Sequence, residues 1–80
     1  MPLPELQLLY NLLRSLWNKD IYIEANQHQF KGKLVHVGKF IPSGTARVSI
    51  QDVLNGKQMI SLKTIGQVWV RNKCLWRASP

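Results

Sequence analysis

The stretch DIYIEANQHQFKGKLVHV, residues 20–37, decides the fold of this chain of 80 residues. Apolar and polar residues alternate on both sides of the polar segment 26–29, which predicts two strands, over 21–25 and 30–37, joined by a turn. Gly32 lies inside the second strand, where a glycine usually marks a sharp bend or a bulge. A strand bent in this way is typical of a small barrel, whose closure removes exposed sheet edges.

The residues that precede this stretch predict one helix over residues 4–18. Pro4 suits the first helical position, and Glu5 complements the positive end of the helix dipole. Leucines recur at helical spacing and form one apolar stripe, at Leu6, Leu9, Leu13 and Leu16. Other apolar residues widen the stripe: Leu8, Tyr10, Leu12 and Trp17. Two interpretations stay open, namely that the helix covers one end of the barrel or that part of it contacts a neighbouring subunit. A membrane-lying helix is disfavoured, because only Arg14 and Lys19 supply cations.

The residues after position 37 predict three more short strands and a frayed end. The alternation predicts strands over 46–51, 58–63 and 68–70, with Ser49 on the outward face of the first. Asn55-Gly56 predicts a type I′ hairpin turn, in which both central residues need positive φ. Residues 71–80 are predicted to form a basic tail that frays. The expected fold is mainly β: a single domain with an N-terminal α-helix and a small, SH3-like, five-stranded antiparallel barrel over residues 20–70.

The charge of the chain favours a polyanionic partner. Eleven Lys and Arg residues stand against four Asp and Glu residues, which gives a formal net charge of +7. Residues 30–80 hold nine of the basic residues and only one acidic residue, Asp52. A basic surface of this density favours RNA, DNA or another polyanion.

The remaining composition excludes several classes of function. Cys74 is the only cysteine, so no intrachain disulfide can form, and the thiol fits a reducing compartment. The N-terminus lacks the pattern of a signal peptide, and we expect a cytoplasmic protein without a membrane partner. No metal-ligand spacing, glycine-rich phosphate loop or nucleophile motif occurs, so we predict a non-enzyme without metal or cofactor.

Two segments resemble the motifs of a known family. Residues 20–23 and 30–37 resemble the first motif of the Sm-like (LSm) family of RNA-binding proteins, which includes the bacterial RNA chaperone Hfq. Residues 59–70 are similar to the second motif. Two departures accompany the resemblance: Gly38 stands where many members carry an acidic residue, and Lys63 keeps only the basic group of the Tyr-Lys-His signature of Hfq. The resemblance implies a homo-oligomeric, Hfq-like ring that binds single-stranded RNA, with an RNA chaperone role as one interpretation.

The resemblance and the charge pattern together nominate site residues. In the family geometry the loops after the second and fourth strands meet near a central pore, where Phe40 would stack on a base and Lys39 and Lys63 would contact phosphates. Packing of Phe40 in the core is the alternative. Further candidates for RNA contact are basic side chains on strands and in the tail: Lys31, Lys33, Arg47, Arg71 and Lys73.

The ring itself is predicted to form through the open edges of strands four and five, with roughly five to seven copies. The expected interface residues come from these two strands: Ile60, Leu62, Val68, Trp69 and Val70. Two alternatives to RNA binding stay open, namely an SH3-like adaptor that binds a protein partner and a DNA-binding barrel.

Overall fold

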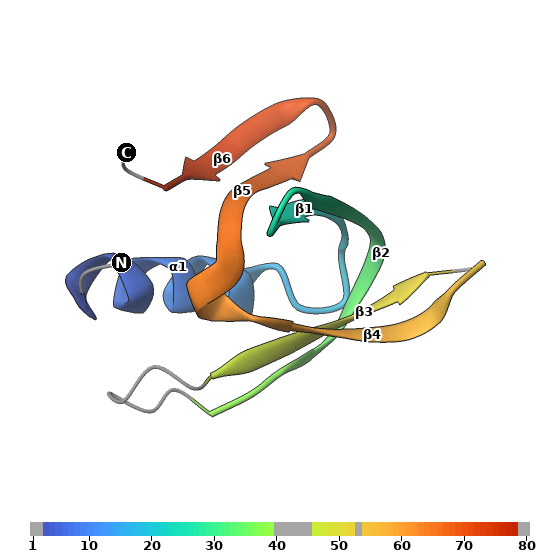
Figure 1. Cartoon of the computed structure of the whole chain (residues 1–80), viewed down its shortest axis with the longest axis horizontal. Coiled ribbons are helices and arrows are strands. Elements are labelled where there is room, and N and C mark those ends of the chain that lie inside the picture. Colours follow the sequence, from blue (N-terminus) through green and yellow to red (C-terminus); the bar gives the residue numbers. More distant parts are fainter. Residues whose placement is uncertain (1–2, 40–45, 53, 79–80) are drawn as a thin grey trace.

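A computed structural model of the protein describes residues 3–39, 46–52 and 54–78. One helix precedes an antiparallel sheet of six strands (Figure 1). The elements follow in the order α1 (Leu3–Ser15), β1 (Asp20–Ala25), β2 (His28–Val37), β3 (Arg47–Asp52), β4 (Gly56–Ser61), the 3₁₀ turn η1 (Leu62–Thr64), β5 (Ile65–Val70) and β6 (Lys73–Arg77).

The helix α1 supplies one wall of the hydrophobic core. Its predicted apolar stripe of four leucines is buried, while Leu8 on another face is 64% exposed. The helix ends at Ser15, earlier than predicted, and residues 16–18 form a turn. Asn18 there has a left-handed backbone with φ 69°, and its N–H donates to the carbonyl oxygen of Leu34 at 2.8 Å. This bond joins the end of the helix to the middle of β2.

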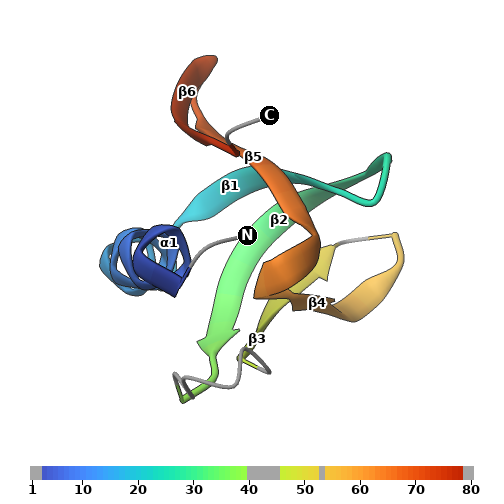
Figure 2. The same cartoon turned by 60° about the vertical axis from the view of Figure 1, so that its left-hand side comes forward.

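The sheet is open, with the strand order β4-β3-β2-β1-β5-β6. It curls strongly, so that β5, which follows β4 through η1, runs in a different direction and pairs with β1 (Figure 2). The prediction of five antiparallel strands is corrected to six, because β6 pairs with β5 through Val70↔Lys73 and Val68↔Trp76. The two edges of the sheet are therefore β4 and β6, and both sides of β5 are paired.

The predicted frayed tail thus contains a strand, β6, along half of its length. Arg71 and Asn72 form a two-residue turn in which both have a left-handed backbone, with φ 50° and 66°. Trp76 then packs partly buried against the core. Residues 79–80 lie outside the described part of the chain.

The predicted bend at Gly32 is confirmed. The first part of β2 pairs with β1, up to Asp20↔Lys33, and the second part pairs with β3, from Lys33↔Gln51 onward. A Cβ atom on Gly32 would overlap the backbone carbonyl of Gln51. Glycine is therefore required at position 32, because any side chain there would keep β3 away from β2 at the point where β2 stops pairing with β1 and begins to pair with β3.

The hairpin predicted at Asn55-Gly56 is present, but its turn type differs. Gly56 has a left-handed backbone with φ 73°, whereas Asn55 is not among the described residues with positive φ. The Asp52 carboxylate organises the turn instead: it accepts bonds from the backbone N–H of Leu54 at 2.8 Å and from Asn55 Nδ2 at 2.9 Å. An aspartate whose side chain accepts a bond from the backbone N–H two residues ahead favours such a turn.

These bonds make the hairpin sensitive to acid. The Leu54 N–H bond, with the Asn55 side chain second, holds the pKa of Asp52 below its ordinary value. A carboxylate with a lowered folded-state pKa contributes stability above the unfolded pKa and loses that contribution as pH falls through the folded pKa. We therefore expect the wild-type protein to lose a small stability contribution below about pH 4. Asp52→Asn should lack this part of the pH dependence in thermal melts, and identical acid profiles for the two proteins would contradict the assignment.

The core contains several residues that were predicted to form a subunit interface. Ile60, Leu62 and Val68 are at most 3% exposed and belong to the hydrophobic cluster of a single chain. Val70 packs partly buried against the same cluster, whereas Trp69 lies outside it. Ser49, predicted to face outward, is 1% exposed, between His36 of β2 and Met59 of β4 in the register. The side chains of Ile60, Leu62 and Val68 are therefore not available to a neighbouring subunit.

Candidate nucleic-acid interface

One end of the sheet brings together three of the predicted basic residues, Lys39, Arg47 and Lys63, which we call the end cluster. The N–H of Gly38, next to Lys39, donates to the carbonyl oxygen of Arg47 at 2.7 Å. The N–H of Leu62, next to Lys63, donates to the carbonyl oxygen of Ala46 at 3.1 Å. The segments after β2 and after β4 thus meet at the start of β3. The predicted Phe40 lies outside the described residues.

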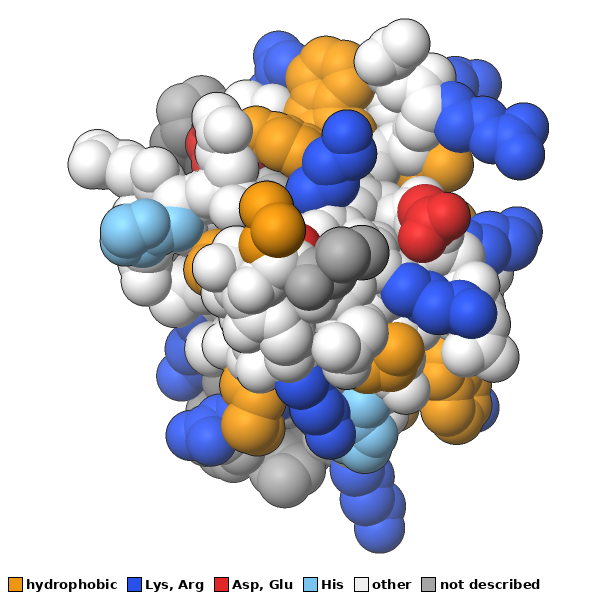
Figure 3. All heavy atoms as spheres, turned by 90° about the vertical axis from the view of Figure 1, so that its right-hand side faces the viewer, with side chains coloured by type: hydrophobic (Ala, Val, Ile, Leu, Met, Phe, Trp, Pro, Cys, Tyr) orange, Lys and Arg blue, Asp and Glu red, His pale blue; other side chains and the backbone are white. Residues whose placement is uncertain are grey.

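The basic side chains are all available to a ligand. Each of the eleven Lys and Arg residues is exposed, and none forms an ion pair within the described ranges. Arg14 makes a cation–π contact, with its guanidinium 5.9 Å from the ring centre of Tyr10. Basic side chains outnumber acidic ones across the face shown in Figure 3. Exposed and unneutralised cations are what a polyanion contacts.

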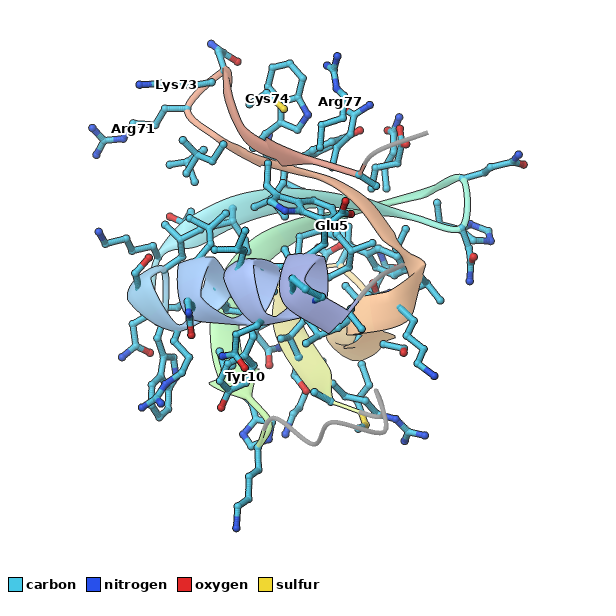
Figure 4. The ribbon with its side chains drawn as sticks, turned by 90° about the vertical axis from the view of Figure 1, so that its left-hand side faces the viewer. Glu5, Tyr10, Arg71, Lys73, Cys74 and Arg77 are labelled. Atoms are coloured by element: carbon cyan, nitrogen blue, oxygen red, sulfur yellow. The ribbon has the colours of Figure 1, made fainter. Side chains whose placement is uncertain are left out.

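A second group of basic residues lies away from the end cluster. Lys31 and Lys33 are exposed on β2, on either side of Gly32. Arg71 and Lys73 extend from the β5–β6 turn on the same side of the hairpin, whereas Arg77 lies toward its other end (Figure 4). The tail residues are therefore held by a folded hairpin, which fixes the direction from which they reach a ligand.

One residue of each pair, Lys31 and Arg71, lines a groove of about 690 Å³. Its lining includes Tyr22 of β1, Lys31 and Gly32 of β2, and Trp69 and Arg71 at the end of β5. A second hollow of about 740 Å³ adjoins it at Lys31 and Gly32 and extends toward the β3–β4 turn. This second hollow is lined by two cations, Lys31 and Lys33, and by two carboxylates, Asp20 and Asp52, so the formal charges of its lining sum to zero.

Sequence reasoning nominated Lys31 and Arg71 but missed Tyr22. Tyr22 occupies an outward position of the alternating strand β1, where a polar residue is the usual choice. A tyrosine at an outward strand position is therefore a signal that the sequence contains. Its role in the groove follows only from the register, which places Tyr22 opposite both Lys31 and Trp69.

The lone thiol and the remaining titratable groups form no further centre. Cys74 is half-buried, and its Sγ contacts the carbonyl oxygen of Trp76 at 3.4 Å. Among the residues that the structure describes, no three His, Cys, Asp or Glu side chains come together as a metal site would require. No helix within the described ranges has the length and apolar character needed to cross a membrane.

Comparison of the chain with protein-family models, with curated proteins and with solved structures found no match. The functional assignment therefore depends on the surface described above.

Proposed function

We propose that the chain is a single-stranded RNA-binding domain of the Sm-like type that acts as a homo-oligomer. The observation that carries the proposal is the set of eleven exposed Lys and Arg side chains, none of them neutralised by an acidic partner in the described residues. The half-buried Tyr22 and Trp69 line a groove together with Lys31 and Arg71, and aromatic groups beside cations favour single strands, because unpaired bases stack on them.

The arrangement of the chain supports the Sm-like type. A helix followed by a strongly bent antiparallel sheet is the order that the sequence resemblance implies, and the 3₁₀ turn η1 separates β4 from β5. The end cluster joins the segments after β2 and after β4, which are the two segments that the resemblance assigns to RNA. The strand β6 is an addition to that pattern.

The mode of assembly changes because of β6. A ring through the edge of β5 would need that edge to be free, but β6 occupies it. The edges that remain are β4 and β6, and an edge strand offers unpaired backbone groups to a second copy. Head-to-tail pairing of β4 with β6 of the next copy would close a ring by rotation.

The test measures binding and mass on the same samples. A fluorescently labelled oligouridine of about ten nucleotides should bind at low salt and lose about two orders of magnitude in affinity between about 50 and 200 mM salt. Light scattering of the full chain should give a multiple of the 9.2 kDa monomer. A protein that binds no oligonucleotide, or binds with a flat salt response, would contradict the RNA-binding function and favour a protein-binding adaptor. A monomer mass at micromolar protein concentration would contradict the proposed ring.

Charge variants locate the binding surface. Combined substitution of the end cluster by glutamine (Lys39→Gln, Arg47→Gln and Lys63→Gln) should reduce the slope of log affinity against log salt by about two. The matched control is Arg14→Gln with Lys19→Gln and Lys57→Gln, which removes the same number of exposed charges from positions outside the end cluster. An equal reduction of the salt slope by the two variants would show that the end cluster contacts RNA no more than other exposed cations do.

A further inference from the structure

The groove between β1, β2 and the β5–β6 hairpin contains two aromatic side chains that the core does not use. Tyr22 and Trp69 are half-buried, and neither belongs to the hydrophobic cluster. They lie directly opposite each other in the pairing of β1 with β5. Residues in such a pair have their Cβ atoms about 5 Å apart on one face of the sheet. The two rings therefore form adjacent platforms on that face.

The indole of Trp69 is held in place from its own strand. Its Nε1–H donates to Gln67 Oε1 at 2.7 Å, and Gln67 also lines the groove. This bond satisfies the polar atom of the indole and restrains the rotation of the ring. A restrained aromatic ring loses little conformational entropy when a planar ligand stacks on it.

Cations flank the aromatic pair on both sides. Lys31 is directly opposite Tyr22 in the pairing of β1 with β2, and Arg71 follows Trp69 by two residues in the turn after β5. Both line the groove, and Asp20 is the only acidic residue among the described residues of its lining. The order across the groove is thus a cation, two aromatic rings and a second cation.

We propose that this groove binds two successive nucleotides of a single-stranded RNA, with their bases stacked on Tyr22 and Trp69 and their phosphates contacted by Lys31 and Arg71. The inference rests on the proposed RNA-binding function and adds to it a site distinct from the end cluster. Aromatic platforms with basic neighbours bind single strands with little sequence preference, because every base has a face that can stack.

The first test removes one platform in the full-length protein. Trp69→Ala should weaken binding of the labelled oligouridine by about 10- to 100-fold and leave the salt slope unchanged, since stacking releases no counterions. Trp17→Ala is the matched control: Trp17 is 49% exposed, lies outside the groove and binds the Val35 carbonyl through its indole. Its affinity should stay close to that of the wild type. Equal affinities for the two variants would overturn the proposal.

A second test keeps the platform and observes it directly. The chain has three tryptophans, so Trp17→Phe with Trp76→Phe leaves Trp69 as the only indole. Added oligouridine should quench its fluorescence along the same titration curve that anisotropy reports. Binding without quenching would overturn the stacking site, and the RNA-binding function would stand on the wild-type salt response. Absence of binding by the wild type would contradict both proposals.

Discussion

Gly32→Ala is expected to lower the free energy of unfolding by about 3 kcal/mol, a large part of what a domain of this size has. The added Cβ would overlap the backbone carbonyl of Gln51, on the neighbouring strand β3. A backbone group cannot rotate away as a flexible side chain does, so β2 and β3 must separate locally. The pairing lost first is that around Lys33↔Gln51, where β2 leaves β1 and joins β3.

The measurement is a thermal melt followed by circular dichroism, in which the midpoint should fall by more than about 10 °C. Gly66→Ala in β5 is the matched control. Its Cβ would meet Glu24 Oε1 at 3.5 Å and the Glu24 carbonyl oxygen at 3.7 Å, which are ordinary contact distances. That variant should melt at or slightly above the wild-type midpoint, because alanine restricts the unfolded chain. Equal midpoints for the two variants would show that the bend does not depend on the missing side chain.

The parts of the fold that depend on local pattern could be predicted from the sequence. Alternation over residues 21–25 and the glycine at position 32 indicate strand β1 and the bend of β2, and the leucine spacing indicates the buried face of α1. In each case one periodicity or one missing side chain determines the structure, and no distant residue is needed.

The strand β6 depends on tertiary contacts that the local sequence pattern does not indicate. Its turn, Arg71-Asn72, has no glycine, although both residues adopt the left-handed backbone that usually favours one. A run of basic residues is typical of a solvated tail. Pairing with β5 and packing of Trp76 on the core make it a strand. Tertiary contacts outweigh the local signal here, and the same strand determines which sheet edges remain for assembly.

The candidate site was predictable in composition but not in arrangement. Lys31 and Arg71 could be nominated by charge alone, since basic residues dominate residues 30–80. Their relation to Tyr22 and Trp69 requires the register between β2, β1 and β5, which sequence alternation leaves undetermined. A shift of the strand register by one residue would place the side chain of Tyr22 on the core face of the sheet, and Tyr22 and Trp69 would no longer be neighbours.

The helix offers a second large effect, with a control on an adjacent residue. Leu9 is fully buried and Leu8 is 64% exposed, although both are leucines of α1. Leu9→Ala should lower the free energy of unfolding by about 2–5 kcal/mol, because the truncation leaves a cavity where the helix meets the core. Leu8→Ala removes the same atoms from a solvated position and should change stability by less than about 0.5 kcal/mol in the monomer.

The pair also tests the interpretation that part of the helix contacts a neighbouring subunit. Urea titrations at several protein concentrations measure both effects, since stability that comes from association rises with concentration. If Leu8 is part of an interface, Leu8→Ala should reduce the concentration dependence and the mass measured by light scattering, while Leu9→Ala lowers stability at every concentration. If Leu8→Ala leaves both quantities unchanged, α1 acts only as a wall of the core. A Leu9→Ala variant as stable as the wild type would contradict the packing of the helix itself.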